Sequence, residues 1–133
     1  MVTSAALRAA RAARGGAAVE LGRTAEGIAA DFLGSQGLRM ELRNFRCRAG
    51  EIDLVARDEG TLVVVEVRTR LNDRYGGAAG SIDSRKQRRI VLATRVLLHR
   101  HRKLARLKVR FDVVIVANVF AETPHVQWIR QAF

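Results

Sequence analysis

The chain has 133 residues, which is the size of one domain and long enough to bury a hydrophobic core. A hydrophobic content of 48% excludes a disordered polymer, and the single cysteine, Cys47, excludes an intramolecular disulfide. The 24 basic and 13 acidic residues give a net charge of +11, which favours a polyanionic partner, nucleic acid ahead of an anionic membrane surface.

Residues 1–18 are rich in alanine and arginine and contain no acidic residue. Although organellar transit peptides share this composition, we favour a basic arm, either flexible or an extension of the first helix, before a single domain at 19–133. No stretch of the sequence is long and apolar enough to span a membrane. With an unpaired cysteine, this predicts a cytoplasmic protein.

The spacing of apolar residues predicts a first helix over 20–36, in which Glu26 adjoins the apolar stripe. Glu26 is either a functional carboxylate or an ordinary residue near a helix N-terminus. A strand is expected over 38–48. Three arginines near its end, which either hold a phosphate backbone or form a solvated strand end, are Arg43, Arg46 and Arg48.

Residues 50–70 predict an antiparallel hairpin, because the runs 52–56 and 62–67 flank turn residues at 58–60. Side chains alternate between the two faces of a strand. We therefore expect two groups on the first strand, Ile52 and Leu54 on one face and Glu51, Asp53 and Val55 on the other.

The register of this hairpin decides how Asp53 and Glu66 meet. A two-residue turn that pairs Arg57 with Gly60 places Asp53 diagonal to Glu66, and a loop two residues longer places them directly opposite. A three-residue loop would instead send them to opposite faces. Neighbouring carboxylates repel unless a positive group lies between them, and hard cations such as Mg²⁺ or Mn²⁺ suit oxygen ligands of this kind.

A glycine-rich loop is expected over 71–82, followed by a second long helix over 83–102 with Ser81 or Asp83 as its cap. Residues 85–110 hold a long series of arginines and lysines and no acidic residue. We interpret this series as a phosphate-contacting surface, with a solvated outer face as the alternative. The candidate nucleic-acid contacts around the hairpin and this helix are Arg70, Arg85, Lys86, Arg88 and Arg89.

Two further strands are expected over 109–116 and 126–130. Asp112 lies on the strand face opposite Phe111, where we expect it to pair with a neighbouring arginine rather than with a metal. The elements together predict a mixed α/β domain of order αβββαββ, because a hairpin with a tight turn must be antiparallel.

The sequence resembles a known family in Glu26, in the run Gly50-Glu51-Ile52-Asp53 and in the run Val65-Glu66-Val67-Arg68. This family is the small bacterial YraN family, also called UPF0102, regarded as relatives of archaeal Holliday junction resolvases in the PD-(D/E)XK nuclease superfamily. The resemblance covers about residue 20 to the end. Further matching pieces are Gly22 with Ala25-Glu26, Arg43-Asn44 with Arg46, Lys86, Arg110-Phe111-Asp112-Val113 and Ala132-Phe133.

The resemblance implies a restriction-endonuclease-like mixed sheet flanked by helices and an endonuclease that cuts DNA, with branched or repair intermediates as candidate substrates. It also implies that Glu26, Asp53 and Glu66 bind Mg²⁺ or Mn²⁺, and that the protein forms a homodimer. Arg68 stands where the superfamily usually has lysine. Arginine stays protonated, so it can stabilise negative charge but cannot transfer a proton.

Three functions therefore stay open. The first is a metal-dependent endonuclease with Glu26, Asp53, Glu66 and Arg68 as catalytic residues. The second, which Arg68 favours, is a nucleic-acid-binding module that keeps the nuclease fold without cutting. The third is a domain whose basic helix docks on an acidic protein.

Overall fold

The computed structural model describes residues 4–70 and 82–133 of the chain. Its elements are α1 (Ser4–Ser35), β1 (Arg39–Cys47), β2 (Gly50–Asp58), β3 (Thr61–Arg70), α2 (Ser84–Arg100), the short 3₁₀ helix η2 (Leu104–Arg106), β4 (Lys108–Ala117) and β5 (His125–Ile129). Helix, three strands, helix and two strands is the predicted order, so the mixed α/β fold is confirmed. The loop expected over 71–82 lies, apart from Ile82, outside the described residues.

The five strands form one sheet in the order β1-β2-β3-β4-β5. Strands β3 and β4 run parallel, and the other neighbours run antiparallel. Parallel neighbours need a long crossover, which the segment containing α2 provides, whereas short turns join β1 to β2 and β2 to β3. The topology therefore follows from the lengths of the connections.

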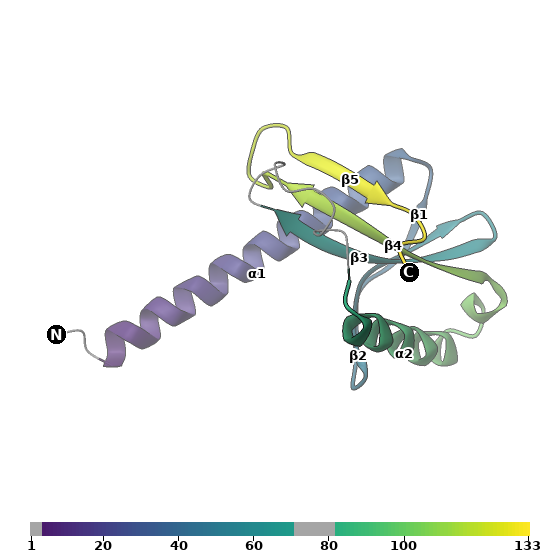
Figure 1. Cartoon of the computed structure of the whole chain (residues 1–133), viewed down its shortest axis with the longest axis horizontal. Helices are drawn as coiled ribbons and strands as arrows, with labels where there is room; N and C mark the ends of the chain where they lie inside the picture. Colours follow the sequence, from purple (N-terminus) through teal and green to yellow (C-terminus); the bar gives the residue numbers. More distant parts are fainter. Residues whose placement is uncertain (1–3, 71–81) are drawn as a thin grey trace.

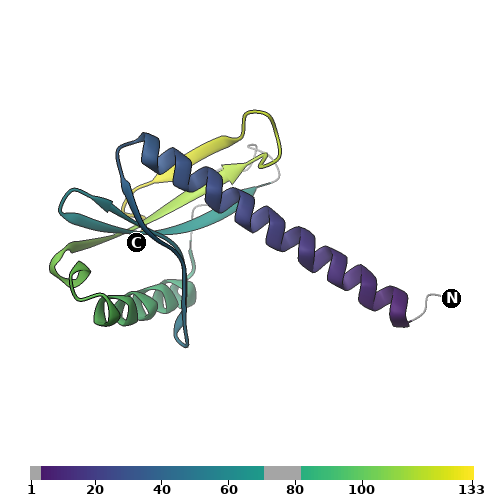
Figure 2. The same cartoon turned by 180° about the vertical axis from the view of Figure 1, so that it is seen from behind.

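The two long helices cover opposite faces of the sheet (Figures 1 and 2). On one face Ala25, Ala29 and Leu33 of α1 pack against the sheet, and on the other face Ile90 and Leu97 of α2 do so. The central strands β3 and β4 are therefore buried on both sides, which explains why both are nearly continuous runs of valine and isoleucine.

Helix α1 begins at Ser4 and runs through residue 18 without a break, which agrees with the alternative that the basic segment extends the first helix. Its N-terminal part projects away from the sheet (Figure 1). A functional division between an arm and the domain at this point stays a prediction. The other end of α1 agrees with the sequence, since Gly37 follows it with φ of +96°, a left-handed conformation that favours glycine.

Helix α2 begins after Asp83, one of the two predicted caps, whose Oδ1 accepts a hydrogen bond of 2.8 Å from the backbone amide of Lys86. This cap fixes where the first turn of α2 starts. The side chains of that turn therefore have defined directions relative to the sheet.

Asp112 is fully buried in β4 and accepts four hydrogen bonds. Arg110 donates two of them, at 2.9 and 3.0 Å, and the others come from the indole of Trp128 and the amide of Gln131, both at 2.9 Å. The predicted pairing of Asp112 with a neighbouring arginine is confirmed. This network ties the segment after β5 to the sheet.

Candidate active site

Strands β2 and β3 pair in the register that joins Leu54 to Val65, with Glu59 and Gly60 as the turn. Continued by one position beyond its last pair, this register would bring Asp53 opposite Glu66, and the charge of Glu66 does raise the pKa of Asp53. This corresponds to the direct arrangement of the two carboxylates, the alternative considered for the longer loop. Pairing extends further into the turn than that alternative assumed, because Asp58 also pairs with Thr61.

The alternation of side chains breaks at Asp53. Leu54 packs on the α1 side of the sheet, whereas Ile52 belongs to the core on the α2 side, so the expectation that these two residues share a face is wrong. The neighbouring strand shows the same break, because Leu42 and Phe45 both pack on the α2 side. Between them lies Asn44 with φ of 54°, a left-handed conformation that turns the strand over while its pairing with β2 keeps the same register.

The break opens a fork between β2 and β3. Their ladder ends at the pair Leu54–Val65, and beyond it the backbone amide of Val67 donates a 2.8 Å hydrogen bond to Oδ2 of Asp53. The carboxylate thus takes the place of a backbone acceptor and is held in the gap between the strands. From here the β1–β2 hairpin continues towards α2 (Figure 1).

Asp53 is half-buried, and burial is the largest cause that raises its pKa from 3.8 to about 7. The negative charge of Glu66 raises the pKa further, and the charges of Glu26 and Glu51 add to it. Only the hydrogen bond from Val67 opposes this rise. Carboxylates from α1, β2 and β3 therefore act on one another at the fork.

Glu66 is buried, which raises the pKa of its carboxyl group. Lys86, from the first turn of α2, opposes this rise most strongly, since its Nζ lies 3.3 Å from Oε1 of Glu66. The guanidinium of Arg68 lowers the pKa as well. The acidic pair is thus flanked by two cations, Arg68 from the same strand and Lys86 from the facing helix.

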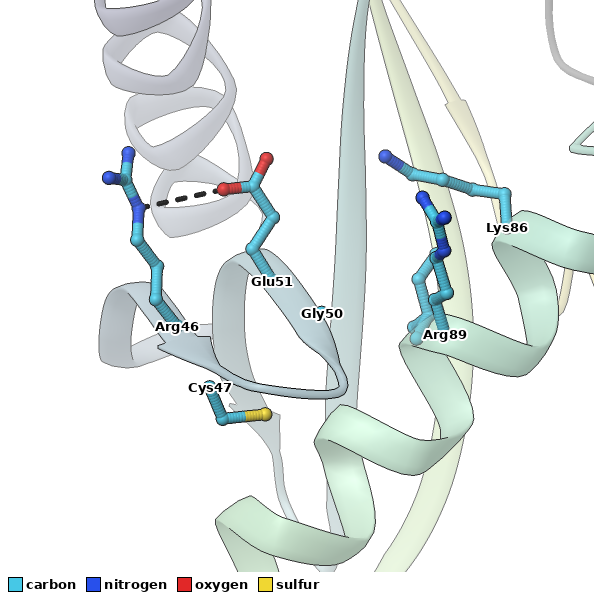
Figure 3. A pocket seen from close by; sticks show the side chains of 7 residues that line it. Arg46, Cys47, Gly50, Glu51, Lys86 and Arg89 are labelled. Carbon is cyan, nitrogen blue, oxygen red and sulfur yellow. Dashed lines mark ion pairs between the residues drawn. The ribbon is translucent and has the colours of Figure 1, made fainter.

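A groove of about 330 Å³ adjoins this site between the β1–β2 hairpin and α2 (Figure 3). Its polar walls are formed by Arg46, Glu51, Lys86 and Arg89. Arg46 lies 3.5 Å from Glu51, and both side chains are exposed. Lys86 belongs to the groove and to the acidic pair at once, so the two features form one continuous surface.

The remaining predicted contact residues are dispersed. Arg43, Arg48 and Arg85 are exposed and line none of the described cavities. Arg88 lines a separate, mainly apolar groove with Phe111 and Phe133. Arg70 donates a hydrogen bond of 3.4 Å to Gln127, while its Nε is buried without an acceptor among the described residues.

Sequence reasoning gave no special role to two residues that shape the site. Glu51 raises the pKa of both Asp53 and Glu66, and strand alternation, which grouped it with Asp53, was the available signal. Asn44 creates the break through its backbone. The only signal was its residue type, since asparagine adopts positive φ more readily than most residues.

The donor set suits a hard divalent cation, because carboxylate oxygens are the ligands that Mg²⁺ and Mn²⁺ prefer. The raised pKa of Asp53 and of Glu66 shows that the fork disfavours its own negative charge, which a cation would relieve. Within residues 4–70 and 82–133, no three His, Cys, Asp or Glu side chains are arranged as a ready metal cluster. The fit of a divalent cation to this site therefore rests on the carboxylates of Asp53 and Glu66.

The fold and this site define a mixed α/β protein with opposed carboxylates at a strand fork, flanked by cations. The sequence profile of the uncharacterised protein family UPF0102 matches residues 25–116. A UPF0102 protein of Pseudomonas putida (strain W619) is 46% identical over 112 residues, which cover 84% of this chain and 91% of the relative. One from Xanthomonas euvesicatoria pv. vesicatoria is 47% identical over 112 residues, covering 84% and 89%. The chain belongs to the UPF0102 family.

No helix in the described segments combines the length with the apolar character needed to cross a membrane.

Proposed function

We propose that the chain is a metal-dependent endonuclease that hydrolyses phosphodiester bonds of DNA, with branched or repair intermediates as its substrates. The observation that carries the proposal is the opposition of Asp53 and Glu66 at the fork, with Lys86 3.3 Å from Glu66. A net charge of +11 supports a polyanionic substrate.

In this proposal Asp53 and Glu66 hold Mg²⁺ or Mn²⁺, and Glu26 on α1 completes or orients the ligand set. When bound, such an ion lowers the pKa of water and neutralises charge on a phosphate. The amide of Val67 fixes the direction of the Asp53 carboxylate through its 2.8 Å hydrogen bond. The carboxylate therefore does not have to be ordered when the ion or the substrate binds.

Hydrolysis forms a bond from a water oxygen to phosphorus and breaks the bond from phosphorus to a sugar oxygen. Negative charge grows on the phosphoryl oxygens in the transition state, and fixed cations stabilise it. Arg68 is suited to this task because its guanidinium remains charged and lies near Glu66. Lys86 contributes a second positive charge from the opposite wall.

The test is cleavage of single-stranded, duplex and four-way-junction DNA in Mg²⁺ and in Mn²⁺. We expect cleavage by the wild-type protein and a loss of about a hundredfold or more in Asp53→Asn and Glu66→Gln, because each removes a charged ligand. DNA binding should survive in both variants. Cleavage that continues in EDTA, or that is unchanged in both variants, would contradict the proposal.

A nucleic-acid-binding module that does not cut is the second candidate, and Arg68 in the position of the superfamily lysine favours it. This candidate predicts salt-sensitive DNA binding without cleavage in any divalent ion. Arg68→Lys separates the two functions. A large gain of cleavage in this variant would show that arginine impairs the natural site. A loss of cleavage would show that the arginine itself takes part in catalysis.

A homodimer is part of the proposal, since resolvase relatives act as dimers on two-fold symmetric junctions. Sedimentation velocity with and without a four-way junction tests it. We expect two chains per junction, and a single bound chain would contradict the dimer.

A further inference from the structure

The groove between the β1–β2 hairpin and α2 is built by a close approach of two elements. A Cβ atom at Gly50 would lie 3.2 Å from both the Cβ and the carbonyl oxygen of Arg89. Glycine at this position therefore lets the hairpin tip rest against the helix backbone. The base of the Arg89 side chain is fixed next to the tip as a result.

The groove carries an excess of positive charge. Arg46, Lys86 and Arg89 line it, and Glu51 is the acidic side chain among its described lining residues. Figure 3 shows Arg89 extending from α2 in the same direction as Arg46 and Glu51 extend from the hairpin, while Lys86 reaches from α2 across towards the hairpin side. Positions three apart lie on one face of a helix, which explains why Lys86 and Arg89 act together.

Arg88 has the same residue type and the neighbouring sequence position, yet it faces elsewhere. It lines the separate groove that contains Phe111 and Phe133. The structure thus divides a basic series that looks uniform in the sequence, because successive helix positions point about 100° apart. Of the basic side chains of α2, Lys86 and Arg89 are the ones that line the groove beside the acidic pair.

We propose that this groove binds the backbone phosphate next to the one that is cleaved, with the guanidinium groups of Arg46 and Arg89 as its donors. The identity of that neighbouring phosphate rests on the proposed function. Planar guanidinium groups match phosphate oxygens in geometry and remain charged. Lys86 belongs to both sites, so the groove and the acidic pair take successive phosphates of one strand.

Glu51 weakens the binding of a phosphate in this groove. Its carboxylate lies 3.5 Å from Arg46 and repels an incoming phosphate. A bound phosphate therefore replaces Glu51 as the partner of Arg46. We expect Glu51→Gln to bind DNA about threefold or more tightly than the wild type, since one repulsive charge near the phosphate is removed.

The matched comparison is Arg89→Gln against Arg88→Gln, measured by fluorescence anisotropy of a labelled oligonucleotide, single-stranded and duplex, over a salt series in EDTA. Loss of one phosphate contact should weaken binding by Arg89→Gln on the order of tenfold and reduce the salt slope by about one. The sequence groups Arg88 with Arg89 as a candidate contact, but because Arg88 lines the separate groove, Arg88→Gln should stay within about twofold of the wild type. Equal effects of the two substitutions would overturn the groove assignment.

The same variants separate this inference from the proposed function. If no divalent ion supports cleavage but only Arg89→Gln weakens binding, the groove stands and the endonuclease fails. If cleavage occurs while Arg89→Gln and Arg88→Gln bind alike, the groove fails and the endonuclease stands. Absence of any DNA affinity at moderate salt would overturn both and favour an acidic protein partner.

Discussion

At Asp53 the structure fixes the position of a carboxylate while disfavouring its negative charge. Its carboxylate has a fixed position because the amide of Val67 donates to it, yet burial and three other carboxylates disfavour its charge. A residue selected for stability alone would be uncharged here. The structure therefore keeps a charge that weakens the apo fold, which is expected of a group with a task in binding or catalysis.

The raised pKa of Asp53 makes a prediction about stability. The folded state binds this proton up to about pH 7 and the unfolded chain only up to about pH 4, so the contribution to stability falls as pH rises through this window. Asp53→Asn keeps an acceptor for Val67 but removes the charge. In EDTA we expect it to be about 1–3 kcal/mol more stable than the wild type at pH 8, and nearly equal to it at pH 4.

Urea unfolding of both proteins at the two pH values measures this difference. A variant that is less stable than the wild type at pH 8 would contradict the account of Asp53. The stability of Glu66→Gln gives a second measure of the repulsion between the Asp53 and Glu66 carboxylates, although this substitution also removes the partner of Lys86.

Asp112 is the opposite case, a buried carboxylate whose bonds are all satisfied. Asp112→Ala leaves Arg110 and the indole of Trp128 without their acceptor, and we expect the fold to lose about 3–5 kcal/mol. Arg39→Gln is the control, since the Arg39–Glu41 pair is exposed and should contribute less than about 1 kcal/mol. Equal unfolding midpoints for the two variants would show that the network has no structural role.

At the scale of elements, the fork between β2 and β3 is the decisive feature. It exists because β1 and β2 change face together, at Asn44 in one strand and Asp53 in the other. Without that change Asp53 would continue the ladder. The site is thus produced by a local irregularity beside a β3–β4 pairing that is regular in register.

Substitutions at Asn44 test this origin of the fork. Asn44→Gly keeps the left-handed conformation and should change stability by less than about 1 kcal/mol, whereas Asn44→Val should cost about 2 kcal/mol or more because a branched side chain resists positive φ. Urea unfolding measures both. If valine and glycine are tolerated equally, the position does not depend on its backbone conformation.

Much of the fold was predictable from the sequence. The Asp83 cap of α2 was one of two candidates, and turn residues predicted the hairpin. Alternation failed at Ile52, since a regular period cannot reveal a strand that changes face through one backbone angle. The long α1 was one of two alternatives for residues 1–18, since an alanine- and arginine-rich composition suits either a flexible arm or an extension of the helix.

The candidate site was predictable only in part. The facing of Asp53 and Glu66 was one of the registers open from the sequence. Which residues of the basic series approach the carboxylates was not, because Lys86 and Arg89 differ from Arg85 and Arg88 only in direction around the helix. That direction depends on how α2 docks on the hairpin, a tertiary contact without a local sequence signal.

At the scale of the whole molecule, a strongly basic chain gathers a few of its 13 acidic residues at the fork. The net charge is +11, yet the charges of Glu26, Glu51 and Glu66 all raise the pKa of Asp53. The general positive field attracts a polyanion, and the local negative charge attracts a cation. The two together are what a metal-assisted reaction on a phosphodiester needs.

Binding of Mn²⁺, measured by isothermal titration calorimetry at pH 8 with the wild type, Asp53→Asn and the control Arg88→Gln, tests the central claim most directly. We predict one ion per wild-type chain, affinity unchanged in Arg88→Gln, and affinity about tenfold or more lower in Asp53→Asn, because the opposed pair loses one of its two charged ligands. A wild-type chain that binds no ion, or an Asp53→Asn variant that binds it equally well, would contradict the account.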